Sequence, residues 1–263
     1  MRLGTVTYMI AAQWDVPTII RNLSDAKFEG VELRTTHAHK VEASLTAEER
    51  RTVRKQFEDG GIEIAGLGTA FEYHAADPAE VKKNIDGTKE YIKLAHDLGC
   101  TGVKVRPNGV PKSARLDDAL KQIGEALREV AEFGLGYGVH VRVEVHGPVT
   151  AELPNIKKIM DHAHHDNALV CWNSNDSDLD KPAKPGDPPS IEKNFKLVAN
   201  KIASVHMRDL FIENYPWRQL FRLLKASGFE GYCFAEIPPS TDPLRVLRYY
   251  RALWLAYQPD AGS

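Results

Sequence analysis

The chain has 263 residues, of which 43% are hydrophobic and 27% are charged, and its formal net charge is -2. This length allows one large barrel or two small domains, and the composition is that of a globular protein with a sizeable core rather than a disordered one. A charge this close to zero gives no general attraction to polyanions, so we expect no nucleic-acid partner.

Nothing near the N-terminus has the order of basic, apolar and small residues that marks a signal peptide. No apolar run approaches the roughly 18 to 20 residues that a membrane span needs. The cysteines Cys100, Cys171 and Cys233 are far apart and lie in or beside apolar runs, which indicates reduced, buried thiols. We therefore expect a cytoplasmic protein with no membrane partner.

Strand-like and helix-like segments alternate along the chain. Short β-rich runs fall at residues 3–8, 30–35, 62–69, 102–107, 141–147, 169–174, 202–209 and 231–238. Helix-compatible segments between them include 46–59, where Thr46 and Glu49 form a capping box, and 78–98, 116–133, 191–200 and 217–226. Alternation of this kind predicts parallel strands joined by helical crossovers.

Eight such units predict an α/β protein with a (β/α)8 TIM barrel fold, forming a single domain over residues 1–263. A doubly wound open sheet is the alternative. The proline-rich stretch 181–189 follows the sixth predicted strand, so it is interpreted as a long loop on the active face of the barrel. It is predicted to be either a lid or substrate-facing wall, or an irregular surface insertion.

Polar side chains end each of the last four predicted strands. They are Glu144, Asn173, His206 and Glu236, and each interrupts an apolar run. Residues at the carboxyl ends of barrel strands meet at one face, and burying two carboxylates with an imidazole is costly unless a cation compensates. Oxygen ligands with one histidine favour a divalent metal, with Mn²⁺ expected first and Mg²⁺, Co²⁺ or Zn²⁺ as alternatives.

Several of these segments together resemble one known superfamily. They are GVEL at 30–33, LGCTGVK at 98–104, the strand of Glu144, VHMRD at 205–209 and FAEIP at 234–238. The sequence resembles the xylose isomerase-like TIM barrel superfamily over its whole length. That superfamily includes tagatose 3-epimerase, hydroxypyruvate isomerase and inosose dehydratase.

The resemblance implies a metal held by Glu, Asp, His and Glu from strands five to eight, which carries over to Glu144, His206 and Glu236. The aspartate position departs from the pattern, because Asn173 stands there, and Asn175 or Asp176 is the alternative ligand. The implied reaction is isomerisation or epimerisation of a small sugar or related keto or hydroxy compound through a metal-bound enediolate. Glu144 and Glu236 would move the proton as the two catalytic residues.

Further polar residues follow the strands. The expected substrate wall after the second, third and fourth strands consists of Glu32, Arg34, His37, Glu72, His74, Lys104, Arg106 and Asn108. The residues predicted to bind substrate are Glu32, His37, His74, Lys104, Arg106, His146, Asn175 and Arg208. Three of these carry alternatives. Arg208 would instead pair with Glu32 or Asp209, and His146 would act either as a proton shuttle or as an orienting group. An inward Lys104 needs a counter-charge such as Glu144 or Glu32, with Schiff-base chemistry as a second interpretation.

The partner implied is a small sugar or keto-sugar, and three other functions stay open. The first is a lyase or dehydratase acting on a keto-sugar, keto-glycoside or inosose at the same metal site. The others are DNA repair of the endonuclease IV kind and sugar binding without catalysis. Away from the site, the histidines at 162, 164 and 165 are interpreted as solvated surface, and the apolar segment 245–255 either packs on the barrel or forms a homodimer contact.

Overall fold

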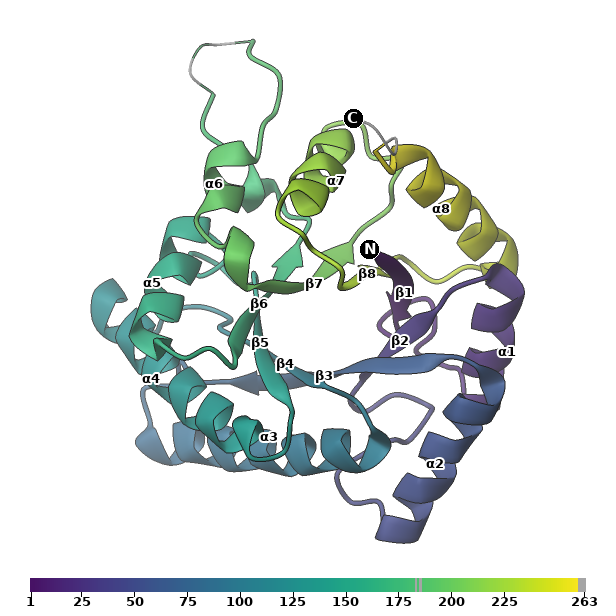
Figure 1. The fold of residues 1–263 in the computed structure, drawn as a ribbon. Helices are drawn as coiled ribbons and strands as arrows, with labels where there is room; N and C mark the ends of the chain where they lie inside the picture. Colours follow the sequence, from purple (N-terminus) through teal and green to yellow (C-terminus); the bar gives the residue numbers. More distant parts are fainter. Residues whose placement is uncertain (183, 185, 260–263) are drawn as a thin grey trace.

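The computed structural model describes residues 1–182, 184 and 186–259. Its strands form a closed parallel barrel in chain order, with β8 pairing back onto β1 (Figure 1). The strands are β1 Arg2–Val6, β2 Gly30–Arg34, β3 Glu63–Glu72, β4 Gly102–Arg106, β5 His140–Glu144, β6 Ala168–Asn173, β7 Ile202–Met207 and β8 Tyr232–Ala235. The predicted TIM barrel and its eight strands are confirmed.

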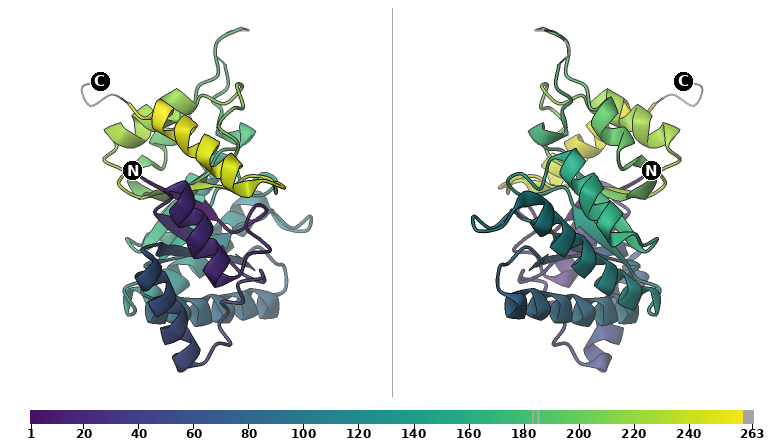
Figure 2. Two further views of the ribbon diagram at one scale, coloured as in Figure 1. Left: turned by 90° about the vertical axis from the view of Figure 1, so that its right-hand side faces the viewer. Right: turned by 90° about the vertical axis from the view of Figure 1, so that its left-hand side faces the viewer.

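Helices surround the barrel, as the side views in Figure 2 show. They are α1 Val16–Ala26, α2 Ala47–Gly60, α3 Pro78–Leu98, α4 Leu116–Leu135, α5 Leu153–Ala163, α6 Glu192–Lys196, α7 Trp217–Ala226 and α8 Pro243–Tyr257, with 3₁₀ turns η1 Asp176–Asp178 and η2 Ala199–Lys201. Among the described residues, no helix is both long and apolar enough to cross a membrane.

Local sequence signals account for how the helices begin and end. The predicted capping box of α2 is present, with Thr46 and Glu49 each satisfying the other's backbone N–H. The helix predicted at 191–200 is shorter than expected. After Lys196 the backbone changes to i to i-3 hydrogen bonds, and Val198 leaves the helical region with φ -133°, so the segment ends in the turn η2.

The strands place apolar side chains outward, under the helices, and several charged side chains inside the barrel. Val31, Leu33 and Val103 belong to the large apolar core, whereas Arg142 and Glu32 are buried but charged. Two glycines make room for these interior charges. A Cβ at Gly102 would lie 2.4 Å from Arg142 Nη2, and one at Gly68 would lie 2.7 Å from Glu32 Oε1. These charged side chains inside the barrel therefore fit only because glycines lie next to them on adjacent strands.

The long loop predicted at 181–189 does lie between β6 and α6, and its described part projects from the barrel in Figure 1. Residues 183 and 185 lie outside the described residues. The base of the loop is fixed by Asp180, whose carboxylate accepts hydrogen bonds from the backbone N–H groups of Lys193 and Asn194. No described residue of the loop lines the cavity at the carboxyl ends of the strands, so the structure does not place it as a wall of that cavity.

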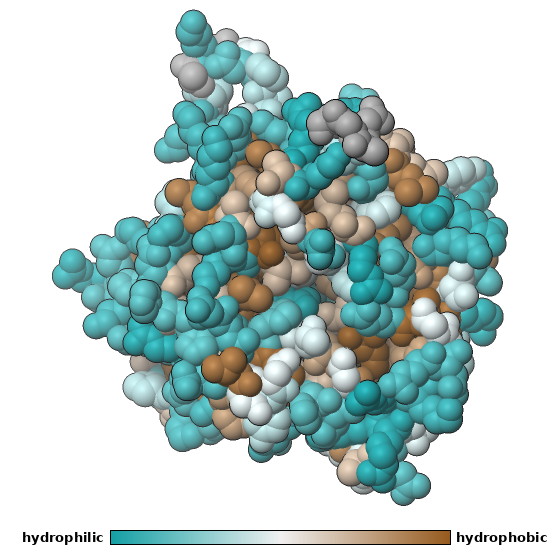
Figure 3. Space-filling model, in the orientation of Figure 1, coloured by the Kyte–Doolittle hydropathy of each residue, from teal (hydrophilic) through white to brown (hydrophobic). Residues whose placement is uncertain are grey.

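The surface combines a hydrophilic periphery with smaller hydrophobic areas. On the face drawn in Figure 3, hydrophilic residues dominate the periphery, and hydrophobic residues show mainly toward the middle between the surrounding segments. On α8, Tyr249 and Leu255 are exposed, while Leu247 and Tyr250 pack into the core. The predicted homodimer contact at this helix stays a prediction.

Candidate metal centre and substrate cavity

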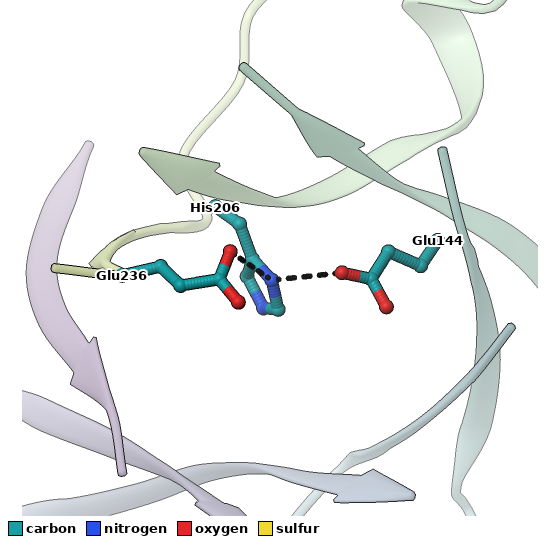
Figure 4. Close-up of side chains that lie close together, drawn as sticks. All are labelled: Glu144, His206 and Glu236. Carbon is teal, nitrogen blue, oxygen red and sulfur yellow. Dashed lines mark ion pairs between the residues drawn. The ribbon is translucent and has the colours of Figure 1, made fainter. Parts of the chain in front are cut away.

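Three of the four predicted metal ligands meet at one point of the barrel. Glu144 ends β5, His206 lies in β7 and Glu236 directly follows β8, and one ligand atom from each lies within 4.8 Å of the other two. His206 Nδ1 is 3.3 Å from Glu144 Oε1 and 3.6 Å from Glu236 Oε2 (Figure 4). In the described part of the chain, these residues form the one group of three or more such side chains that could hold a metal ion.

The two nitrogens of the His206 ring face different partners. Nδ1 points toward Glu144 and Glu236, while Nε2 lies 3.2 Å from Glu32 Oε1 on the deeper side. None of these approaches has hydrogen-bond geometry, so both ring nitrogens lack a hydrogen-bond partner among the described residues. In metal sites, the ring nitrogen of a ligating histidine that faces away from the metal usually donates to a carboxylate or carbonyl, and Glu32 is the residue placed to take that role toward Nε2.

Electrostatics keep this group charged despite burial. Burial alone would raise the pKa of Glu144, but Lys104, His206 and His146 outweigh it, and the pKa lies well below its ordinary value. For His206, burial would lower the pKa, but Cys171, Glu32 and Glu144 raise it well above the ordinary value. The interior therefore holds ionised carboxylates that attract cations.

Lys104 provides the nearest fixed positive charge. Its Nζ donates to Glu144 Oε2 over 2.6 Å, and the two side chains are 5% and 3% exposed. Burial would lower the pKa of Lys104, but Glu144 and Glu32 together raise it. The amine stays protonated, which supports the electrostatic interpretation of Lys104 and not the Schiff-base alternative.

Asn173 lies beside the same carboxylate. Its Nδ2 donates to Glu144 Oε1 over 3.2 Å, so the amide orients Glu144 in the folded chain. The two alternative ligands from this segment are directed elsewhere. Asn175 Nδ2 donates to the Val145 carbonyl, and Asp176 Oδ1 accepts from Arg208. Of the three, Asn173 alone contacts the cluster.

These residues fit a divalent cation on the basis of their own chemistry. Two carboxylates converge on an imidazole nitrogen that is buried and has no hydrogen-bond partner in the described structure. Carboxylate oxygens with one imidazole form a donor set suited to Mn²⁺, Mg²⁺, Co²⁺ or Zn²⁺. Asn173 as a fourth ligand stays a prediction.

A cavity of about 120 Å³ opens at this cluster. It is lined by Val6, Tyr8, Arg34, Lys104, Arg106, Glu144, His146, His206 and Glu236. Of the predicted substrate-binding residues, the cavity therefore includes Lys104, Arg106 and His146. Burial and the charges of Arg106 and Lys104 lower the pKa of His146, against the opposing effect of Glu144 and Glu236, so its imidazole is neutral near pH 7.

The remaining predicted substrate-binding residues do not line the cavity. Glu32 is completely buried beneath His206. The ring of His37 hydrogen-bonds Thr7, and His74 lies 3.7 Å from Glu72. Asn175 supports its own loop through Val145. For these residues the structure shows structural contacts, and their binding of substrate stays untested.

Arg208 has a partner that the sequence did not indicate. Its Nη2 lies 2.8 Å from Asp176 Oδ1, and its guanidinium lies 5.4 Å from the centre of the Tyr215 ring. The predicted alternative partners, Glu32 and Asp209, are therefore wrong. The reason is geometric, because the turn η1 after β6 brings Asp176 to the end of β7.

Of the polar residues that line the cavity, Tyr8 was missed as a site residue at the sequence level, whereas Arg34 was expected on the substrate wall. Tyr8 follows β1, and Arg34 ends β2 two positions beyond Glu32. The alternation of a strand gives a signal for Arg34, since residues two apart face the same side of a strand. Tyr8 lies just outside its strand, where alternation no longer fixes direction.

Fold and site together define a class, the (β/α)8 barrels with a candidate metal centre at the carboxyl ends of the late strands. A family model described as xylose isomerase-like TIM barrel matches residues 20–253. The chain belongs to this family, as its motifs indicated. No curated protein sequence matches the chain significantly.

Solved structures of similar fold include enzymes of more than one kind. D-psicose 3-epimerase with D-tagatose, from Clostridium cellulolyticum H10, has a TM-score of 0.80 at 14% identity, covering 98% of this chain and 100% of that one. The IOLI protein with a bound zinc atom has a TM-score of 0.78 at 14% identity, covering 98% of each chain. The probable 3-DHS dehydratase AsbF of Bacillus anthracis has a TM-score of 0.72 at 12% identity, covering 97% and 99%. At these identities the similarity establishes the fold.

Proposed function

We propose that the protein is a divalent-metal-dependent isomerase or epimerase acting on a small sugar or a related keto or hydroxy compound. The observation that carries the proposal is His206, whose Nδ1 lies between Glu144 and Glu236 while its Nε2 faces Glu32. An epimerase among the similar structures supports the proposed reaction, and the zinc bound to another similar structure supports the proposed metal dependence. We expect Mn²⁺ as the ion.

Glu144, His206 and Glu236 would hold the cation, with Asn173 as the additional donor from β6. The cation would supply Lewis acidity, stabilising negative charge that develops on a substrate oxygen. The proton chemistry falls to the side chains. Isomerisation needs one group that removes a proton from carbon and one that returns it.

The two carboxylates differ in how freely they can accept that proton. Lys104 occupies one oxygen of Glu144, whereas Glu236 is 20% exposed and has only His206 within 4.0 Å as an ion-pair partner among the described residues. We propose that Glu236 removes the proton from the substrate carbon. Glu144, held in place by Lys104 and Asn173, would return a proton on the opposite side of the substrate. His146 is a neutral imidazole on the same wall and can relay a proton.

The decisive experiment measures exchange of a substrate C–H with solvent deuterium, by NMR, over a panel of ketoses and hydroxy ketones. We expect exchange with Mn²⁺ present and a loss of about 10²- to 10⁴-fold in Glu236→Gln, the usual contribution of a general acid or base. Titration calorimetry with Mn²⁺ checks the cation itself. Exchange that persists unchanged in chelator-treated protein would refute metal dependence.

A lyase or dehydratase is the second candidate, because a probable dehydratase shares the fold and Asn173 departs from the family ligand pattern. Both chemistries begin with loss of a proton from carbon and diverge afterward. Mass spectrometry of the products separates them. Isomerisation conserves mass, whereas elimination releases water or an aglycone.

A further inference from the structure

Two arginines lie on the cavity wall formed by the early strands. Arg34 ends β2 and Arg106 ends β4, and both line the same cavity as Glu144 and His206. On β3, the strand between them, Gly68 pairs with Arg34 and with Lys104, whereas Glu72 pairs with Arg106. A Cβ at Gly68 would lie in ordinary contact with Arg34 Cδ, at 3.5 Å, but would crowd Glu32 Oε1 at 2.7 Å. Gly68 therefore makes room for the buried Glu32, and the two arginines line the cavity on either side of β3.

These arginines have few counter-charges. Arg106 Nη2 donates to Glu72 Oε1, and that oxygen also accepts from Asn108. Arg106 Nε is buried without a hydrogen-bond partner in the described structure. Arg34 donates Nη1 to the carbonyl of Thr35, a neutral acceptor, and no described carboxylate lies within 4.0 Å of its guanidinium.

The positive charge on this wall is only partly compensated, because Arg106 pairs with Glu72 whereas Arg34 has no ion-pair partner among the described residues. Burial, followed by the positive charge of Arg106, lowers the pKa of Arg34 against the opposing effect of Glu144 and Glu32, so the two arginines repel each other across the cavity. The third cation on the wall, Lys104, is already paired with Glu144. A bound neutral sugar would leave the arginine pair as it is, whereas an oxyanion would relieve the repulsion and satisfy the open donors.

We propose that Arg34 and Arg106 form an oxyanion subsite for a carboxylate or phosphate group of the substrate. This inference rests on the proposed function, and it names the substrate class as small hydroxy or keto acids or phosphorylated sugars rather than neutral sugars. The arginines and the candidate metal ligands line the same cavity of about 120 Å³. The cation cluster would hold substrate oxygens at one end of it, and the arginines would hold the anionic group at the other.

Calorimetric titration tests the subsite with three matched probes: D-glycerate, glycerol 3-phosphate and the neutral analogue glycerol. Each is titrated into chelator-treated protein and into Mn²⁺-loaded protein. We expect at least one of the two anions to bind more tightly than glycerol. Arg34→Gln and Arg106→Gln should each reduce that preference about 10- to 100-fold, the range for hydrogen bonds to a charged group.

The control variant is Arg51→Gln, which removes an exposed arginine on α2 far from the cavity, and it should retain the preference. The anion that binds identifies the group, carboxylate or phosphate. Mn²⁺ affinity is measured on the same samples, so that subsite and metal site are tested separately. If neither anion binds more tightly than glycerol, or if the preference survives in both arginine variants, the subsite is refuted even where Mn²⁺ binding stays intact.

Discussion

The two halves of the barrel supply opposite charges to one cavity. The late half, β5 to β8, provides Glu144, His206 and Glu236 around the candidate cation position. The early half, β1 to β4, provides Arg34, Lys104 and Arg106. Candidate cation ligands thus converge on one side of the cavity, and basic side chains lie on the other side.

Two contacts join these halves and give each a role in the other's chemistry. Lys104 of β4 pairs with Glu144 of β5, and Glu32 of β2 lies behind His206 of β7. The early strands therefore do more than form a substrate wall, since they set the charge and orientation of the late-strand ligands. Breaking each contact in turn shows how strongly the halves depend on each other.

The largest effect is expected from Glu144→Gln. The substitution leaves the buried Lys104 without its closest counter-charge, which for a buried pair costs about 3 to 5 kcal/mol of unfolding free energy. Activity should also fall by about 10²- to 10⁴-fold. Chemical denaturation and the deuterium-exchange assay measure the two losses.

A second substitution separates stability from activity at this pair. Glu144→Gln combined with Lys104→Met removes both charges, so most of the lost stability should return while activity stays low. Glu236→Gln is the matched control for stability, because Glu236 is more exposed and has no lysine or arginine partner among the described residues. If Glu144→Gln were as stable as the native chain, Glu144 would not be the counter-charge that stabilises the buried Lys104.

The next largest effect is expected from Glu32→Gln. Removing the carboxylate behind Nε2 leaves His206 less firmly oriented and less basic, and loss of such a partner typically weakens metal affinity by about 10- to 100-fold. Mn²⁺ titration measures the change. Glu29→Gln, just before the same strand but exposed, should bind Mn²⁺ as the native protein does. Equal affinity in both variants would contradict a role for Glu32 at the metal site.

Sequence alone predicted the barrel and the late half of the site, because both depend on periodic features. Alternating segments gave the eight strands, and polar residues that interrupt apolar runs marked Glu144, His206 and Glu236. Parallel strands then force their carboxyl ends to the same face. The structure brings these three side chains together.

Depth inside the barrel was the information that sequence lacked. Glu32 and Arg34 face the same side of β2, yet Glu32 is fully buried behind His206 and Arg34 lines the cavity. How deep a residue lies depends on the stagger between strands, which no local pattern reports. The pairing of Arg208 with Asp176 was missed for a related reason, since it depends on the path of a turn.

The smallest effect is expected at Asn173, where the late half departs from the family pattern. Asn173 Nδ2 now donates to Glu144 Oε1 over 3.2 Å. Asn173→Asp would replace that amide with a carboxylate, so two negative charges would lie side by side. Without metal this repulsion should destabilise the protein by about 1 kcal/mol or more. With Mn²⁺ the added charge should tighten binding on the order of tenfold. Melting curves in chelator and in Mn²⁺ should therefore shift in opposite directions from those of the native protein.

The same substitution in a Glu144→Gln background tests whether the repulsion is the cause. With Glu144 neutral, the penalty in chelator should disappear, because the two sites interact directly and their effects are not additive. If Asn173→Asp alone bound Mn²⁺ more tightly but was not destabilised in chelator, the side chain at position 173 would not lie beside the Glu144 carboxylate. Unchanged Mn²⁺ affinity would mean that β6 contributes no ligand, leaving the late half with three.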